Sequence, residues 1–269
     1  MDSAVLAQTL CVAAVAFLYA AVGHGGATGY IAALSLFGVS HEQIAATALI
    51  LNCVVASISL FAYARAGELK WRLALPYLIL SVPCAFLGAR VPVSKQVFAW
   101  VLSLVLIAAS LRFLFLPGQF KAAGKTAVLG AAEARETGEN EGAASQSSKA
   151  PPLYASVSTG AALGFLSGMV GIGGGVFLSP IMILCGWATV RETAAASALF
   201  IVCNSLSGIV GRLTGGNFAL YNLVPFLGSA IVAAMLGSAL GARYFSSNAL
   251  RRLLAVVLLI AAIRLLSVH

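Results

Sequence analysis

Long apolar segments separated by short polar gaps dominate this chain of 269 residues. The hydrocarbon core of a bilayer is about 30 Å thick, so a spanning helix needs about 20 mostly apolar residues. Most of the apolar segments reach or approach that length, and two are too short. The long segments are 3–22, 43–64, 73–89, 97–116, 153–170, 193–211, 219–242 and 250–268, and the short ones are 27–39 and 176–187. The pattern predicts an all-α integral membrane protein with about eight transmembrane helices.

Composition and charge favour the same class. Hydrophobic residues make up 61% of the chain and charged residues 9%, whereas soluble domains carry about 25% charged residues. The net charge is +8, but the cations lie in gaps between apolar segments, as at Arg65, Lys70 and Arg72. This is typical of topology-setting charges at a membrane surface, and no basic stripe indicates nucleic-acid binding. We expect a multi-pass cell-membrane protein in contact with lipid, in the inner membrane if the source is bacterial.

A polar stretch divides the chain nearly in half. Residues 117–152 are rich in Ala, Gly, Ser, Lys and Glu, and their four positive and four negative charges cancel. Low hydrophobicity with mixed charge is typical of a solvated, flexible segment. The sequence therefore predicts a first transmembrane repeat at 1–116, a flexible polar linker at 117–152 and a second transmembrane repeat at 153–269.

The two apolar halves carry matching landmarks in the same order. The sequence LGAR at 87–90 recurs unchanged at 240–243. Further matches are GHGGAT at 23–28 with GIGGGV at 171–176, HEQIAATAL at 41–49 with RETAAASAL at 191–199, Pro76 with Pro225, and 108–112 with 260–264. Their order and near-constant offset indicate two homologous halves. The charge distribution leaves open whether these repeats are inverted or parallel, and we favour inversion because sites at broken helices often come with it.

Each short apolar segment follows a glycine cluster, a pattern expected of secondary transporters whose discontinuous helices hold substrate near the bilayer midplane. Glycine lets the chain break sharply, and the helix that begins after a break, or a re-entrant segment, has unpaired N–H groups that attract anions. The alternative is that these glycines only permit close helix packing. We therefore predict substrate-binding residues at Gly23, His24, Gly25, Gly26 and Thr28 in the first break, and at Gly171, Gly173, Gly174 and Gly175 in the second.

Polar side chains inside the helices that follow the breaks are further candidates, because they are costly in a membrane. Thr47 and Asn52 follow the first break, and Ser197 and Asn204 follow the second. The two asparagine amides either bind substrate oxygens or form hydrogen bonds between helices. We expect no buried Arg or Lys at the breaks, so that the helix ends supply much of the attraction for an anion.

Three residues are candidates for proton coupling. His24 has a side chain that titrates near neutral pH, so it is a candidate for carrying a proton or for binding the anion. Glu42 and Glu192 stand in the first turn of their helices, where we expect them to complement the helix dipole, with proton coupling as the alternative. The histidines are scattered and no metal-ligand cluster or catalytic pair stands out, so we expect no enzyme, no metal and no cofactor.

The duplicated glycine break, followed by a helix that opens on Glu, Ala and Ser or Thr, resembles the sulfite exporter TauE/SafE family. The second half carries the resemblance best, in GMVGIGGG at 168–175 with Pro180, then 196–198 and Cys203-Asn204. The first half departs from the triple glycine and has no proline that matches Pro180.

The resemblance implies an exporter of sulfite, organosulfonates or related small sulfur-containing anions. Protons are the candidate coupling ion because His24 titrates near neutral pH. The mechanism would be alternating access around a midplane site, and the main alternative is a passive anion channel. The sequence leaves open which anion is moved, in which direction, and the oligomeric state, a homodimer included.

Overall fold

The computed structural model describes residues 3–35, 37–39, 41–91, 151–216 and 218–246, with single positions at 103, 107, 249, 252, 253, 255, 256, 259 and 263. Every regular element within this part of the chain is a helix. Six of these helices are long and apolar enough to cross a membrane. The prediction of an all-helical membrane protein is therefore confirmed. The predicted spans at 97–116 and 250–268, and nearly all of the linker at 117–152, lie outside the described residues.

Of the helices that the structure describes, four precede the predicted linker and four follow it. The first group is α1 (Ser3–Ala21), α2 (Ala27–Ser35), α3 (His41–Arg65) and α4 (Trp71–Gly88), and the second is α7 (Leu153–Val170), α8 (Gly175–Leu184), α9 (Val190–Thr214) and α10 (Leu223–Arg243). The two short apolar segments form α2 and α8, of 9 and 10 residues. At 1.5 Å per residue such helices reach only about half of the hydrocarbon thickness.

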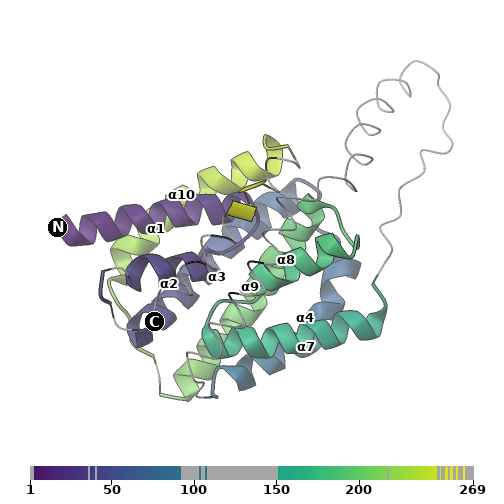
Figure 1. Cartoon of the computed structure of the whole chain (residues 1–269), viewed down its shortest axis with the longest axis horizontal. Helices are drawn as coiled ribbons and strands as arrows, with labels where there is room; N and C mark the ends of the chain where they lie inside the picture. Colours follow the sequence, from purple (N-terminus) through teal and green to yellow (C-terminus); the bar gives the residue numbers. More distant parts are fainter. Residues whose placement is uncertain are drawn as a thin grey trace.

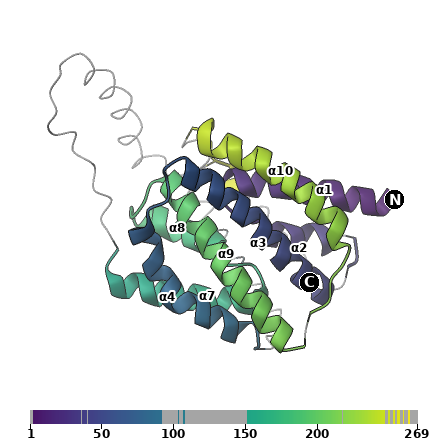
Figure 2. The ribbon, with the colours of Figure 1, turned by 180° about the vertical axis from the view of Figure 1, so that it is seen from behind.

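The helices α3 and α9 form the centre of the molecule. Buried residues make up 61% of the spanning window of α3 and 67% of that of α9, against 28–33% in the four outer spans. These two helices pack against each other, while α1 pairs with α10 on one side and α4 pairs with α7 on the other (Figures 1 and 2). Both short helices rest on the central pair, α2 on α3 and α8 on α9.

Glycine stripes bring the outer helices into close contact. A β-carbon at Gly164 of α7 would collide with the carbonyl of Ser81 on α4, and one at Gly241 of α10 with the carbonyl of Ala21 on α1. Such close backbone approach is how small residues promote helix packing in membranes. The stripe on α7 consists of Gly160, Gly164 and Gly168, and that on α10 of Gly237 and Gly241.

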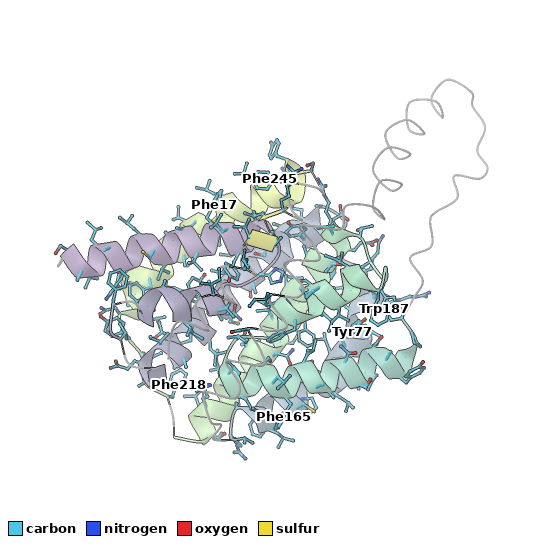
Figure 3. The ribbon with its side chains drawn as sticks, viewed as in Figure 1. Phe17, Tyr77, Phe165, Trp187, Phe218 and Phe245 are labelled. Atoms are coloured by element: carbon cyan, nitrogen blue, oxygen red, sulfur yellow. The ribbon has the colours of Figure 1, made fainter. Side chains whose placement is uncertain are left out.

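Large apolar side chains cover the outer surface. Val224 is 82% exposed and Phe61 is 66% exposed, an arrangement that suits contact with lipid chains and not with water. Tyr77, by contrast, is fully buried and lies between α7 and α8 in Figure 3, where Phe165 lies on the outer side of α7. The described helices therefore bury polar and aromatic groups at the centre and present hydrocarbon outward.

Candidate functional site

The first break separates α1 from α2, and the second separates α7 from α8. The left-handed backbone at Gly23 (φ 78°) and Gly26 (φ 94°) turns the chain at the first break. Gly171, Gly173 and Gly174 do the same at the second, with φ between 70° and 84°. Only glycine adopts these angles without strain. The residues at 21–28 and at 171–180 are buried without exception.

Both short helices begin with buried amides that lack partners. Among the described residues, the backbone N–H groups of Gly25, Gly26, Gly174 and Gly175 form no hydrogen bond. A buried backbone N–H without a partner is rare, and the start of a helix carries partial positive charge. The two breaks therefore offer the groups that bind small oxyanions at helix starts elsewhere.

Asn52 of α3 holds the two breaks together. Its Oδ1 accepts a hydrogen bond from the amide of Ala27 at 3.1 Å, and its Nδ2 donates to the carbonyl of Ile172 at 3.4 Å and to Ser205 Oγ at 2.9 Å. A β-carbon at Gly25 or at Gly173 would collide with this amide. Both amide hydrogens are therefore used inside the protein, which corresponds to the helix-bridging alternative for Asn52 and not to substrate binding by its amide hydrogens. The two breaks converge on this one side chain.

Asn204 of α9 has the opposite character. It is 1% exposed, yet neither Nδ2 nor Oδ1 has a hydrogen-bond partner in the described part of the structure. It lies one helical turn beyond Phe200 and Ile201, which contact Gly174 and Gly173 of the second break. An unsatisfied buried amide costs about 1–3 kcal/mol. Asn204 thus keeps its full hydrogen-bonding capacity on the face of α9 that packs against this break.

His24 connects the first break to α8 and α9. Its Nδ1 lies 3.0 Å from the carbonyl of Val22, which only accepts, so Nδ1 carries a proton. Its Nε2 lies 3.1 Å from Ser179 Oγ, which lies 2.7 Å from Ser197 Oγ. In the neutral imidazole Nε2 accepts, so Ser197 donates to Ser179 and Ser179 donates to His24. Ser179, which sequence reasoning missed, completes this chain one turn beyond Gly175.

The two predicted threonines make different contacts. Thr28 Oγ1 lies 2.8 Å from the hydroxyl of Tyr19, within the first break. Thr47 Oγ1 instead accepts from the amide of Tyr221 at 2.9 Å and donates to the carbonyl of Gln43 at 2.9 Å. The partners of Thr47 lie in its own helix and in the segment before α10, and not in either break.

The acidic candidates lie at helix starts. Glu192 accepts from the amide of Thr189 at 2.9 Å and donates its own amide to Thr189 Oγ1 at 3.2 Å, a capping box that begins α9. Glu42 lies in the first turn of α3, and its side chain falls outside the described part. Arg191, beside the box, pairs with Glu68 at 3.7 Å. Burial raises the pKa of the Glu68 carboxyl, and the nearby Arg191 opposes that rise.

A half-buried cation lies beside the second break. Arg212, near the end of α9, donates from Nη2 to the carbonyl of Met169 at 3.3 Å, where α7 ends. Its Nη2 would lie 3.1 Å from a β-carbon on Gly171, and its Nε is buried without a partner among the described residues. In the sequence Arg212 directly follows the apolar segment at 193–211, which is typical of an interfacial charge. Only the packing of α9 on α7 places its guanidinium beside the second break.

Comparison with known proteins agrees with this architecture. Residues 9–265 match the family model described as sulfite exporter TauE/SafE. Over 267 residues the chain is 34% identical to the probable membrane transporter protein y4hK of Sinorhizobium fredii (strain NBRC 101917 / NGR234), which covers 99% of this chain and all of that protein. No solved structure matches the chain. The six candidate spans among the described residues make this a multi-pass membrane protein, and the chain belongs to the sulfite exporter TauE/SafE family.

Proposed function

We propose that the chain is a secondary transporter that exports sulfite, organosulfonates or related small sulfur-containing anions. The description of its family supports this substrate class, and the name of the Sinorhizobium relative supports membrane transport. One observation carries the proposal: two buried helix starts, at Gly25-Gly26 and at Gly174-Gly175, present amides that have no partner among the described residues.

The proposed anion accepts hydrogen bonds from these amides and from Asn204. Gly25 and Gly173 both lie against the Asn52 amide, so the two helix starts converge on one point. Asn52 is a positioning residue, because its amide hydrogens are already donated to Ile172 and Ser205. A sulfite or sulfonate group has several oxygens and can accept from more than one amide at once, which suits a site formed by two helix starts.

The packing of the outer helices supports the proposed duplication. In the proposed duplication α1 corresponds to α7, α3 to α9 and α4 to α10. The α1–α10 contact in one half-to-half arrangement then has its counterpart in the α7–α4 contact, and the α3–α9 contact is its own counterpart. An exchange of the two halves relates two states of an alternating-access transporter built from repeats. We infer that the repeats are inverted and that the outer pairs move against the α3–α9 centre.

Burial of both breaks favours alternating access over the passive channel. The residues at 21–28 and 171–180 have no exposed member, whereas a conducting pore requires a continuous path through the membrane. We infer that this arrangement is an occluded state, which opens to one side at a time.

Transport by purified protein in proteoliposomes tests the proposal. Sulfite, sulfoacetate, sulfate and thiosulfate are offered with and without a pH gradient. Accumulation of sulfite or sulfoacetate above equilibrium in response to the gradient is expected. Equilibration without accumulation would instead identify a passive channel, and failure to move any of the four anions would overturn the proposal.

Asn204→Leu is the variant that probes the site in this assay. Substitution of Gly26 or Gly174 would place a side chain at a φ of 94° or 74° and would strain the fold whatever the function. Leucine has as many side-chain heavy atoms as asparagine and branches at the same carbon, and it removes only an amide that makes no bond in the described part. Loss of uptake in this variant is therefore attributable to the site.

A further inference from the structure

We propose that Arg212 is the cationic anchor for the transported anion, and that with Asn204 it forms a binding track on α9 beside the second break. This rests on the proposed transport function. The two residues lie on one face of α9, because Asn204, Gly208 and Arg212 follow one another at four-residue spacing. The same face carries Ile201, which contacts the break at Gly173 and Gly175.

Among the described residues, no carboxylate balances the charge of Arg212. Arg191–Glu68 is the one ion pair among the described residues, and the bond of Arg212 to Met169 is to a neutral carbonyl. Its Nε is buried and unpartnered in that same part of the chain. Charged side chains within membrane-spanning helices are costly and are normally paired or used in a substrate path. The guanidinium is therefore short of an anion, and its fork of donors suits the oxygens of a sulfite or sulfonate group.

Gly208 places no side chain between the two polar groups. A β-carbon there would meet only Leu49, at 3.8 Å, which is an ordinary contact distance. The α-carbons of Asn204 and Arg212 are about 12 Å apart along the helix, and long helical side chains extend toward the helix N-terminus, which brings the guanidinium closer to Asn204. An anion held at Arg212 thus has a polar group one step deeper on the same face.

Arg212 stands at the surface end of this track. The residues that follow it, Leu213 to Gly216, are exposed, whereas Asn204 is fully buried. Hence we place the first capture of the anion at Arg212 and its deeper binding at Asn204 and the helix starts of the breaks.

Four variants in proteoliposomes and in thermal unfolding with sulfite or sulfoacetate test this inference. Arg212→Gln keeps a donor for the Met169 carbonyl but removes the charge, and Arg212→Lys restores the charge. Arg90→Gln is the matched control. Arg90 is exposed and donates to Thr214 at 3.0 Å, so this substitution also removes one arginine charge near the same end of α9. Asn204→Leu reports on the inner site.

In Arg212→Gln we expect the KM for sulfite to rise at least about tenfold, the effect of losing one charge-assisted hydrogen bond. The anion-dependent rise in melting temperature should also be lost. Arg212→Lys should recover part of both effects, and Arg90→Gln should stay within about twofold of the wild type.

Two results would overturn the inference. A wild-type KM and anion shift in Arg212→Gln, together with lost uptake in Asn204→Leu, would remove Arg212 from the track and leave the proposed function intact. Alternatively, Arg212→Gln could melt below the wild type by the same amount with and without the anion, at an unchanged KM. That result would mean that Arg212 only stabilises the end of α7. A wild-type protein that neither binds nor moves any of the anions would overturn the proposed function itself.

Discussion

The Asn52 amide on α3 donates to the Ser205 hydroxyl on α9 over 2.9 Å, joining the two most deeply buried of the candidate membrane spans. The same amide contacts Ala27 and Ile172, one residue from each break. Asn52 is thus a node at which the central helices and both helix breaks are tied to one another. Its removal should disturb all four segments together.

We predict that Asn52→Ala lowers the free energy of unfolding by about 3 kcal/mol or more, because it leaves the buried partners in Ala27, Ile172 and Ser205 unsatisfied. Ser205→Ala, which removes one bond from this node, should cost less. Unfolding of detergent-purified protein measures both. A wild-type melting temperature in Asn52→Ala would show that these hydrogen bonds do not hold the central helices and the breaks together.

Asn204→Leu should impair transport without lowering stability, in contrast to Asn52→Ala. The Asn204 amide makes no hydrogen bond in the described part of the chain, so an apolar substitute should leave the melting temperature unchanged or raise it. Uptake of sulfite should fall at least about tenfold, as expected when a hydrogen bond to a charged ligand is lost. Transport at the wild-type rate in a folded variant would exclude Asn204 from the site.

His24→Gln should uncouple transport from the pH gradient. When Nε2 gains a proton it becomes a donor, and Ser179 must turn its hydroxyl to another acceptor. The carbonyl of Gly175 lies 3.2 Å from Ser179 Oγ and can accept it. Proton binding at the first break would thereby change a hydrogen bond at the second.

Glutamine at position 24 can still form a hydrogen bond with Ser179 but, unlike histidine, takes up no proton. Gradient-driven accumulation of sulfite should therefore fall at least about tenfold, whereas sulfite exchange at equal pH should stay within about twofold. Ser179→Ala, which keeps the imidazole and breaks the chain to Ser197, is the companion variant. Driven accumulation that survives His24→Gln would assign the histidine a purely structural role.

Gly164→Ala should destabilise the α4–α7 pair. The added methyl would collide with the Ser81 carbonyl of α4, and overpacking of this kind costs about 1–3 kcal/mol. Gly228→Ala on α10 is the control, because a β-carbon there would meet nothing within 4 Å. The melting temperatures of the two variants measure the effect, and equal values would show that the outer pair tolerates wider spacing.

The helices follow closely from the apolar pattern, and the site does so only in part. The short segment predicted at 176–187 is α8 at Gly175–Leu184, and the one at 27–39 is α2 at Ala27–Ser35. The length of an apolar run and the glycines before it determine where such a helix begins. These are local properties that one sequence contains.

The two asparagines show where such reasoning ends. Asn52 and Asn204 both stand in apolar helices after a glycine break, and their sequence context does not distinguish them. Asn52 uses its amide to bridge helices, while Asn204 has no partner among the described residues. The difference arises from which groups α3 and α9 bring near each amide. Arg212 was missed for the same reason, since its environment depends on the end of a helix far away in sequence.

Each outer helix of the first half packs against an outer helix of the second half, and this pairing also limits the order in which the chain can assemble. The interface of α4 with the glycine stripe of α7 forms only after the polar stretch at 117–152 has been synthesised, and α1 pairs with α10, which is synthesised later still. The helices α1 and α4 must therefore stay in the bilayer without their partners until α10 and α7 have been synthesised. Once assembled, the two portions interlock, so a protease that cuts within 117–152 should leave fragments that purify together and still transport.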